Sequence, residues 1–201
     1  MKLYFAPGAC SLSPHIVARE AGIPLQLEKV DTRTKTIKTE GDFWKVNPKG
    51  YVPALEIEPG LVLTEGPAIV QYLADQKPQA GLVPAAGTLE RYRVQEMLGY
   101  INSELHKTYT PLFYPNTPEA LREERKEYLR KRYSLIEEQL AGKNFLFGDT
   151  FTIADAYLFV VTTWAGHVKL SLDGFPNLQA FQARVAARPA VREALKAEGL
   201  A

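Results

Sequence analysis

The first 75 residues alternate between short apolar runs and amphipathic stretches. Leu3-Tyr4-Phe5 is a short apolar run of the kind that forms a buried strand. The next segment has Ile16 and Val17 on one side of a helical pattern and stops at Gly22. Residues 25–30 then alternate between apolar and polar positions, which predicts a half-buried strand. The order strand, helix, strand is therefore expected at the start of the chain.

The segment that follows is polar and broken over residues 31–49, with a short helical piece near residues 42–44 and a turn at residues 47–50. Two further alternating runs, residues 52–57 and 61–63, are separated by Glu58-Pro59-Gly60 and predict a hairpin. Gly66-Pro67 then opens a second helix. The first part of the chain is thus expected to have the order βαβ followed by ββα.

Beyond the proline- and glycine-rich residues 78–87, only helical periodicity is present. A long helix is expected after Thr88, and another from residue 119 to about Leu140. Thr152 and Asp155 have the spacing of a capping box, which opens a strongly apolar helix extending to about Val168. Two short helices begin at prolines 176 and 189. The pattern predicts an α/β domain of residues 1–77, a linker of residues 78–87 and an all-α domain of residues 88–201.

Composition narrows the function classes. The chain has 201 residues, of which 46% are hydrophobic and 23% charged, and its 24 basic and 23 acidic residues nearly cancel. This balance gives no overall attraction for nucleic acid or for an anionic membrane, and no apolar run approaches the length of a membrane span. The N-terminal residues enter a strand without a signal-peptide pattern. A single cysteine cannot form an internal disulfide, and the three histidines lack metal-ligand spacing, so a cytoplasmic protein without a metal is expected.

That single cysteine, Cys10, stands between the first strand and the first helix. Pro14 suits the first turn of that helix, and Ser11 or Ser13 can cap it. Free N–H groups and the helix dipole favour a thiolate at such a position, so a lowered pKa is expected for Cys10. The alternative is that Cys10 is a small buried apolar residue, as most lone cysteines are.

A cysteine after the first strand and a proline before the third resemble the thioredoxin fold. With an all-helical second half, the whole chain resembles a cytosolic glutathione transferase. The cysteine together with Glu104-Leu105-His106-Lys107 is similar to the bacterial beta class. The further segments that carry the resemblance are Asn47-Pro48, Val52-Pro53-Ala54-Leu55, Thr64-Glu65-Gly66-Pro67-Ala68-Ile69 and the Thr152–Asp155 box.

The resemblance implies an enzyme that binds reduced glutathione and promotes attack of its thiolate on small hydrophobic electrophiles, as a homodimer without a tightly bound cofactor. Cys10 and His106 would be catalytic, with His106 contacting the bound thiol. Tyr4 and Ser11 are alternatives, because other transferase classes use a tyrosine or serine hydroxyl. The wall of the co-substrate pocket is expected to include Tyr109, Phe113, Trp164 and His167.

For glutathione itself, the resemblance implies a cis Pro53 that turns the Val52 backbone toward an extended peptide. Glu65 and the Gly66 amide would hold the γ-glutamyl end. The remaining contacts would come from Cys10, Lys35, Ser103, His106 and Glu104. Of these, Glu104 would reach the glutathione from a second subunit. Two positions depart from the family pattern, since relatives often carry serine at position 66 and asparagine at position 99, where this chain has glycine.

Each of these residues also has a structural interpretation. Pro53 can be an edge-strand proline, Glu65 and Gly66 a helix cap, Lys35 a solvated charge and the aromatic residues core. Two other functions stay open: a glutaredoxin-like monothiol oxidoreductase that uses Cys10, for which no second cysteine stands at the +3 position, and a non-catalytic protein that binds glutathione or hydrophobic ligands.

Overall fold

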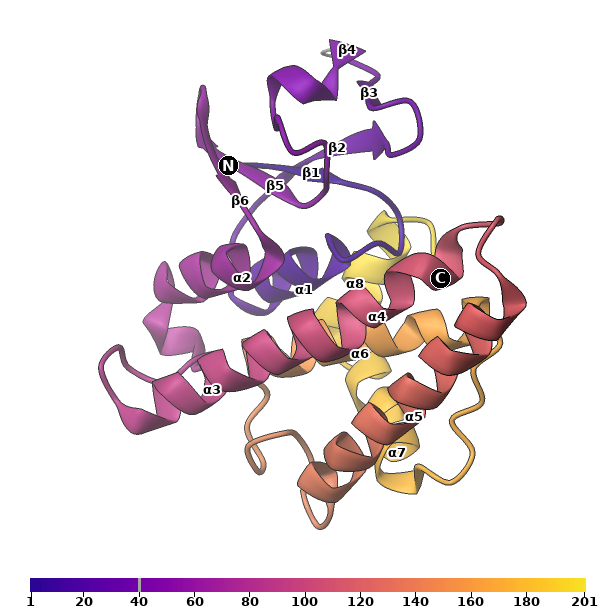
Figure 1. The fold of residues 1–201 in the computed structure, drawn as a ribbon. Coiled ribbons are helices and arrows are strands. Elements are labelled where there is room, and N and C mark those ends of the chain that lie inside the picture. Colours follow the sequence, from indigo (N-terminus) through magenta and orange to yellow (C-terminus); the bar gives the residue numbers. More distant parts are fainter. Residues whose placement is uncertain (40) are drawn as a thin grey trace.

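A computed structural model describes residues 1–39 and 41–201 of the protein. Its strands form one mixed sheet in the order β4-β3-β2-β1-β5-β6 (Figure 1). β1 and β2 run parallel, and the other neighbouring strands pair antiparallel. The strands are β1 (Lys2–Phe5), β2 (Gln26–Asp31), β3 (Thr36–Ile37), β4 (Gly41–Asp42), β5 (Ala54–Glu58) and β6 (Leu61–Thr64). The expected βαβ–ββα order is confirmed, whereas β3 and β4, at two residues each, are too short to show alternation in the sequence.

Helices α1 (Leu12–Glu20) and α2 (Gly66–Asp75) lie between the sheet and the remaining helices (Figure 1). Leu3 and Leu55 of the sheet and Ile16 of α1 are fully buried in a core that also includes residues of the helical part. Helix α1 packs against α2 as well as against α6 and α8. The fold is therefore the expected thioredoxin-like α/β domain followed by an all-helical domain.

The helical part is built around α6 (Ile153–His167), which is buried over most of its length. The Thr152–Asp155 capping box is present, and the Asp155 carboxylate also accepts a hydrogen bond from the Leu146 N–H at 2.8 Å. The other α-helices are α3 (Leu89–Tyr100), α4 (Lys107–Tyr109), α5 (Glu119–Leu140), α7 (Pro176–Ala186) and α8 (Pro189–Ala197). Short 3₁₀ turns occur at η1 (Phe43–Lys45), η2 (Pro78–Ala80) and η4 (Thr110–Phe113).

The long helix expected after Thr88 is not regular. Between α3 and α4 it contains a π-helical turn, η3 (Ile101–His106), and it ends in η4. The hydroxyls of Ser103 and Thr108 donate to the carbonyls of Gly99 and Glu104, four residues earlier, and such bonds disturb a helix. Pro111 has no N–H to continue the ladder. The π turn is the segment that carries His106.

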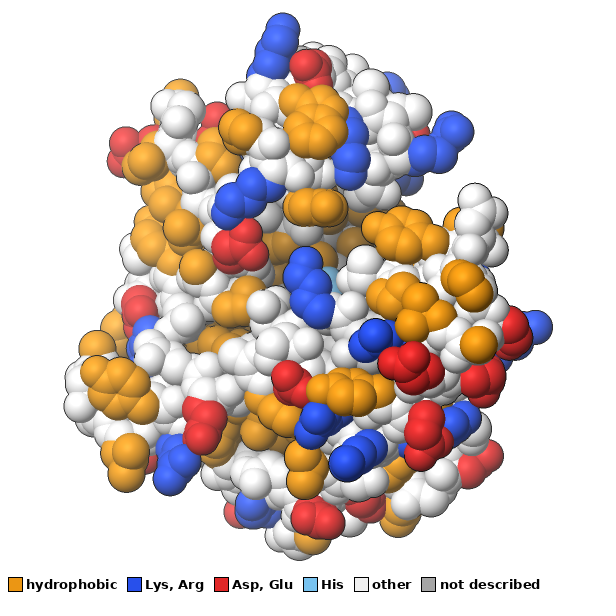
Figure 2. Space-filling model, viewed as in Figure 1, with side chains coloured by type: hydrophobic (Ala, Val, Ile, Leu, Met, Phe, Trp, Pro, Cys, Tyr) orange, Lys and Arg blue, Asp and Glu red, His pale blue; other side chains and the backbone are white. Residues whose placement is uncertain are grey.

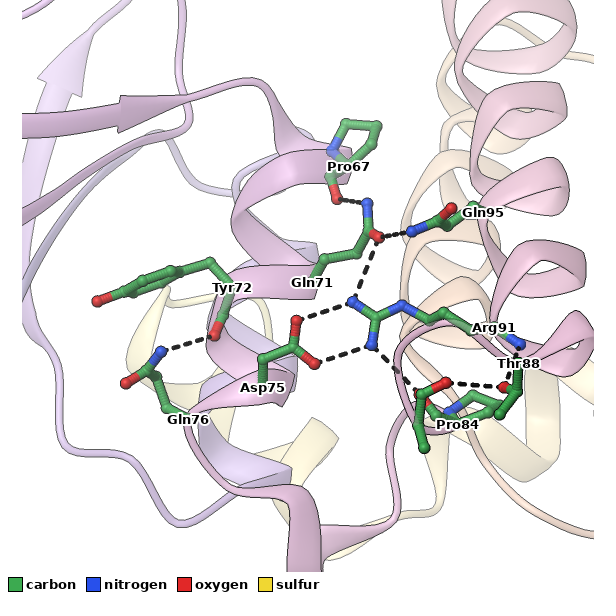
Figure 3. Close-up of polar contacts among 10 residues, drawn as sticks. Pro67, Gln71, Tyr72, Asp75, Gln76, Pro84, Thr88, Arg91 and Gln95 are labelled. Carbon is green, nitrogen blue, oxygen red and sulfur yellow. Dashed lines mark hydrogen bonds and ion pairs between the residues drawn. The ribbon is translucent and has the colours of Figure 1, made fainter.

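Arginine–carboxylate pairs with two bonds each connect the first part of the chain to the helices. The Arg91 guanidinium of α3 makes two 2.8 Å bonds to the Asp75 carboxylate at the end of α2 and also donates to the Pro84 carbonyl (Figure 3). Arg188, just before α8, forms a second two-bond pair with Glu20 at the end of α1, at 2.6 and 2.8 Å. Both helices under the sheet are thus fixed to the helical part by oriented, two-bond contacts.

No helix in the described part of the chain is long and apolar enough to cross a bilayer. Across residues 1–39 and 41–201, no three histidine, cysteine, aspartate or glutamate side chains are arranged to hold a metal ion.

Candidate functional site

A cavity of about 410 Å³ opens where the segment before β5 and the end of β6 face η3, η4 and α6. Figure 2 shows a hollow between the sheet part above and the helices below, in which histidine atoms are visible. Of the predicted site residues, the cavity brings together Cys10, Val52, Pro53, Glu65, Gly66, His106 and Phe113. Its other lining residues are Asn47, Lys49, Tyr51, Thr64, Asn102, Lys107, Thr110, Tyr114 and Tyr157. The volume suits a small peptide or a drug-sized molecule.

Cys10 lies at the inner end of this cavity, and its Sγ donates a 3.3 Å hydrogen bond to the Val52 carbonyl. The residue keeps some exposure, but its sulfur is enclosed, and burial raises the pKa of the thiol to about 12. Backbone N–H groups of Cys10 and Ser11 and the charge of Lys107 lower the pKa, but by less than burial raises it. The expected thiolate is therefore wrong for the ligand-free cavity, because desolvation of the charged sulfur outweighs the helix start.

The loop that carries Cys10 is held by bonds other than the predicted cap. The Ser11 hydroxyl bonds the N–H and carbonyl of Ala6 and not the free N–H groups of α1. The Gly8 N–H donates to the Glu198 carboxylate at 3.1 Å, and the Gly8 carbonyl accepts from the Trp164 indole at 2.9 Å. Residues distant in sequence therefore fix the shape of the loop before α1.

The opposite wall contains two unusual backbone positions. The Val52–Pro53 bond is cis, as expected. Glu65 has a φ of +69°, a conformation that non-glycine residues rarely adopt and that clusters at functional sites. The Glu65 carboxylate lies 2.7 Å from the Lys49 ammonium, and Gly66 begins α2 directly after it. A carboxylate and a helix N-terminus are thus adjacent at the cavity wall.

His106 faces these residues from η3. Its Nδ1 lies 2.6 Å from the Tyr157 hydroxyl, and that hydroxyl donates to Asn102 Oδ1 at 3.0 Å. Burial, with the positive charge of Lys107, lowers the pKa of His106 to about 4, and the negative charge of Glu65 acts in the opposite direction. Burial also raises the pKa of Tyr157. His106 is therefore neutral at pH 7, while Tyr157 keeps its proton.

Aromatic side chains form the outer end of the cavity, where Phe113 and Tyr114 are about half exposed. Trp164 and Tyr109 lie behind this surface: the Trp164 ring meets those of His106 and Phe113 edge-on, and Tyr109 is fully buried. Both residues support the wall from within the core. His167, also predicted here, is exposed near the end of α6.

The remaining predicted glutathione contacts lie elsewhere in this ligand-free protein. Lys35 Nζ donates to the Gly50 carbonyl at 2.7 Å and lies 5.3 Å from the Tyr51 ring centre, beside the cavity mouth. Ser103 is exposed on η3. Glu104 accepts a 2.6 Å hydrogen bond from Tyr128 and pairs with Arg132 at 3.0 Å. The placement of Lys35 and Ser103 fits a supporting role in glutathione binding, and that of Glu104 fits a contact with glutathione bound to a second copy of the chain.

Sequence reasoning missed several lining residues. Tyr157 stands on the apolar helix α6, where a tyrosine is expected to be a core residue. Tyr114 follows Pro111, where the helical pattern is broken. Lys49 and Lys107 look like ordinary solvated charges. A signal was available for Asn102, which falls on the same helical face as His106 and lines the cavity with it.

Comparison with known proteins agrees with this architecture. The family model described as "Glutathione S-transferase, N-terminal domain" matches residues 8–76, and "Glutathione S-transferase, C-terminal domain" matches residues 100–189. The glutathione S-transferase GstA of Escherichia coli O157:H7 is 48% identical over 200 residues, covering 100% of both sequences.

Two solved structures are also similar over 100% of both chains. A sphingomonad glutathione S-transferase complexed with glutathione has 44% identity and a TM-score of 0.95. A beta-class glutathione S-transferase of Sphingomonas chungbukensis has 45% identity and a TM-score of 0.96.

The thioredoxin-like sheet meets the helical bundle across the cavity, with a cis-proline at the junction, and the similar proteins of known class are transferases. With these similarities, the chain belongs to the glutathione S-transferase family. Within that family it is a bacterial transferase of the beta class.

Proposed function

We propose that the protein binds reduced glutathione in the cavity between Val52 and His106 and directs its thiolate at a small hydrophobic electrophile. The observation that carries this proposal is the convergence of Cys10, the cis Val52–Pro53 bond, Glu65 and His106 on one cavity. The sphingomonad relative, at 44% identity, is described as complexed with glutathione. Glutathione serves as a substrate, and no tightly bound cofactor is part of the proposal.

In this arrangement the Val52 backbone pairs with the cysteinyl unit of glutathione as an added strand would. Glu65 receives the γ-glutamyl ammonium, and the Gly66 end of α2 receives the neighbouring carboxylate. Lys35 meets the glycyl carboxylate, with Ser103 at the rim. The positive charge of Lys107 beside Cys10 and His106 favours a thiolate between them.

Cys10 acts on bound glutathione as a hydrogen-bond donor in this proposal. Its raised pKa keeps the S–H proton, which already points at the Val52 carbonyl and can turn to a glutathione thiolate. The enclosed, protonated sulfur favours this role over monothiol exchange as the main reaction. Phe113 and Tyr114, supported by Tyr109 and Trp164, bind the electrophile, with His167 beyond them on α6.

The domain division at residues 78–87, a cytoplasmic location and a homodimer belong to the same proposal. In the dimer, Glu104 would reach the glutathione of the second subunit. A sedimentation experiment at micromolar concentration should give twice the chain mass, and a single-chain mass would contradict the dimer.

The function is tested by glutathione titration calorimetry and by aryl-halide conjugation. Glu65→Gln should weaken glutathione binding about 10- to 100-fold, since it removes one charge-assisted contact. Glu58→Gln, an exposed carboxylate at the end of β5, is the matched control and should change nothing. A wild-type protein that binds no glutathione would overturn the proposal.

Variants of Cys10 distinguish glutathione conjugation from thiol–disulfide exchange. Cys10→Ser keeps a donor and should retain most conjugation, Cys10→Ala should lose it, and both should lose reduction of a glutathione mixed disulfide. Full conjugation by Cys10→Ala would assign thiolate binding to another donor.

A further inference from the structure

The hydroxyl of Tyr157 joins two side chains of η3, and its single proton decides how they are connected. Tyr157 OH donates to Asn102 Oδ1 at 3.0 Å and lies 2.6 Å from His106 Nδ1. Because a phenol has one proton to donate, the bond to Asn102 leaves the Tyr157 oxygen as an acceptor toward His106. His106 Nδ1 must then carry a hydrogen.

We infer that Asn102 and Tyr157 are positioning residues that hold His106 in its Nδ1–H tautomer, so that Nε2 is the proton acceptor for the thiol bound in the cavity. This inference rests on the proposed function for the identity of that thiol, glutathione. The tautomer itself is a property of the ligand-free protein.

The backbone of η3 brings both partners to the same hydroxyl. Asn102 and His106 lie within one π-helical turn, and such turns inside α-helices are frequent at functional sites. Tyr157 reaches them from α6, where its side chain is 2% exposed, so water does not compete for the hydroxyl. The three side chains therefore form an ordered chain of hydrogen bonds at the cavity wall.

The imidazole ring is also fixed in orientation. The Trp164 ring meets it edge-on with centres 4.9 Å apart, and the Trp164 indole is in turn bonded to the Gly8 carbonyl. With its ring against Trp164 and Nδ1 on Tyr157, His106 has little freedom to turn. A general base held by a third group in this way is a recurrent device of nucleophile activation.

The proton transfer balances without any further reactant. The S–H bond of glutathione breaks, its electron pair stays on sulfur as the thiolate, and a new N–H bond forms at His106 Nε2. The resulting imidazolium still donates from Nδ1 to Tyr157, whose proton still goes to Asn102, so the network needs no rearrangement. After the sulfur has attacked an aryl halide, the halide leaves with the electron pair of its bond to carbon, and the imidazolium returns its proton to water.

The charged groups around His106 are consistent with this proton transfer and with the Nδ1–H tautomer. Lys107 and Glu65 are the two charges that act on it, with opposite signs. Neither is hydrogen-bonded to the imidazole in the described residues, so the tautomer is set by the neutral Tyr157 and Asn102 side chains.

The test is the imidazole ¹⁵N spectrum of ligand-free protein at pH 7.5, which distinguishes the two neutral tautomers of each of the three histidines. His106, assigned by its loss in His106→Gln, should show a protonated Nδ1. Asn102→Leu removes the acceptor of Tyr157, whose proton then turns to His106 Nδ1, so the spectrum should switch to the Nε2–H form. Tyr157→Phe should give a mixture of both.

Tyr133→Phe is the matched control, because it removes a buried hydroxyl that bonds Tyr109 outside the cavity. It should leave the His106 spectrum as in wild type. Conjugation of an aryl halide should fall about 10- to 100-fold in kcat for Asn102→Leu and Tyr157→Phe, with the glutathione KM changing less than about twofold.

An Nε2–H form in the wild type, or the same form in wild type and both variants, would overturn the inference. If Asn102→Leu fails to fold, the Tyr157→Phe spectrum decides. A correct tautomer in a protein that binds no glutathione would instead refute the proposed function alone, so the two failures are distinguishable.

Discussion

At the scale of single residues, burial of a side chain determines its protonation state more strongly than its position relative to a helix does. Cys10 stands one residue before Ser11, the N-cap of α1, yet its thiol is protonated because its sulfur is enclosed. His106 is likewise neutral at pH 7 through burial. The ligand-free cavity therefore contains two uncharged groups, the Cys10 thiol and the His106 imidazole.

The state of Cys10 can be measured by alkylation with iodoacetamide, followed by intact mass, since the chain has one cysteine. With a pKa raised to about 12, the thiolate fraction should rise about tenfold per pH unit, so the rate should still be rising at pH 10. Free glutathione under the same conditions is the control and should level off earlier. A plateau between pH 6 and pH 8 would show a low-pKa thiol instead.

At the scale of elements, the start of α6 depends on one carboxylate. Asp155 accepts hydrogen bonds from the N–H and hydroxyl of Thr152 and from the N–H of Leu146, all within 2.8 Å. Because α6 carries both Tyr157 and Trp164, this cap positions the cavity wall as well as the core.

Asp155→Ala should lower the free energy of unfolding by about 2–4 kcal/mol, because it removes the cap and leaves buried N–H groups without partners. Urea denaturation at pH 7.5 measures it. Asp149→Ala is the control: it removes an exposed bond to Asn144 and should cost less than about 0.5 kcal/mol. Equal losses in the two variants would contradict the role of the cap.

At the scale of the whole molecule, the thioredoxin-like part and the helices are expected to unfold together, because α1 and α2 are tied to the helical part. Of the two arginines that pair with these helices, Arg91 is the more enclosed, with its side chain 7% exposed, whereas that of Arg188 is 29% exposed. Arg91→Lys cannot form the two-bond pair with Asp75 and should lower the free energy of unfolding by about 1–3 kcal/mol.

Arg93→Lys, in an exposed pair with Glu96 one turn apart, is the matched control and should change stability by less than about 0.5 kcal/mol. Urea curves followed by fluorescence and by circular dichroism should coincide for both variants. Two separate transitions would show that the parts unfold independently.

The regular elements were predictable because their periodicity is local: α5, α6 and the β5–β6 hairpin each follow from their own residues. The π turn at η3 was not, since it depends on how Ser103, Thr108 and Pro111 act together on one helix. The strands β3 and β4 could not be predicted, because two residues are too few to show the alternation of apolar and polar positions.

The cavity lining was predictable where a motif stood in sequence, as at Cys10, Pro53 and Glu65. It was not predictable where tertiary packing decides, as for Tyr157 on an apolar helix or for the pKa of Cys10. Contacts such as the hydrogen bond from Trp164 to Gly8 join residues 156 positions apart, and no local sequence pattern predicts them.

The bond from Gly8 to Glu198 spans 190 positions of the chain. His15, in the first helix, also reaches Glu198, at 2.9 Å in a fully buried contact. During synthesis the ribosome releases the loop around Cys10 long before it releases α8. The nascent loop must therefore wait for nearly all of the chain to emerge, and a truncated translation product that ended before α8 would have Cys10 but not the contacts that fix its loop in place.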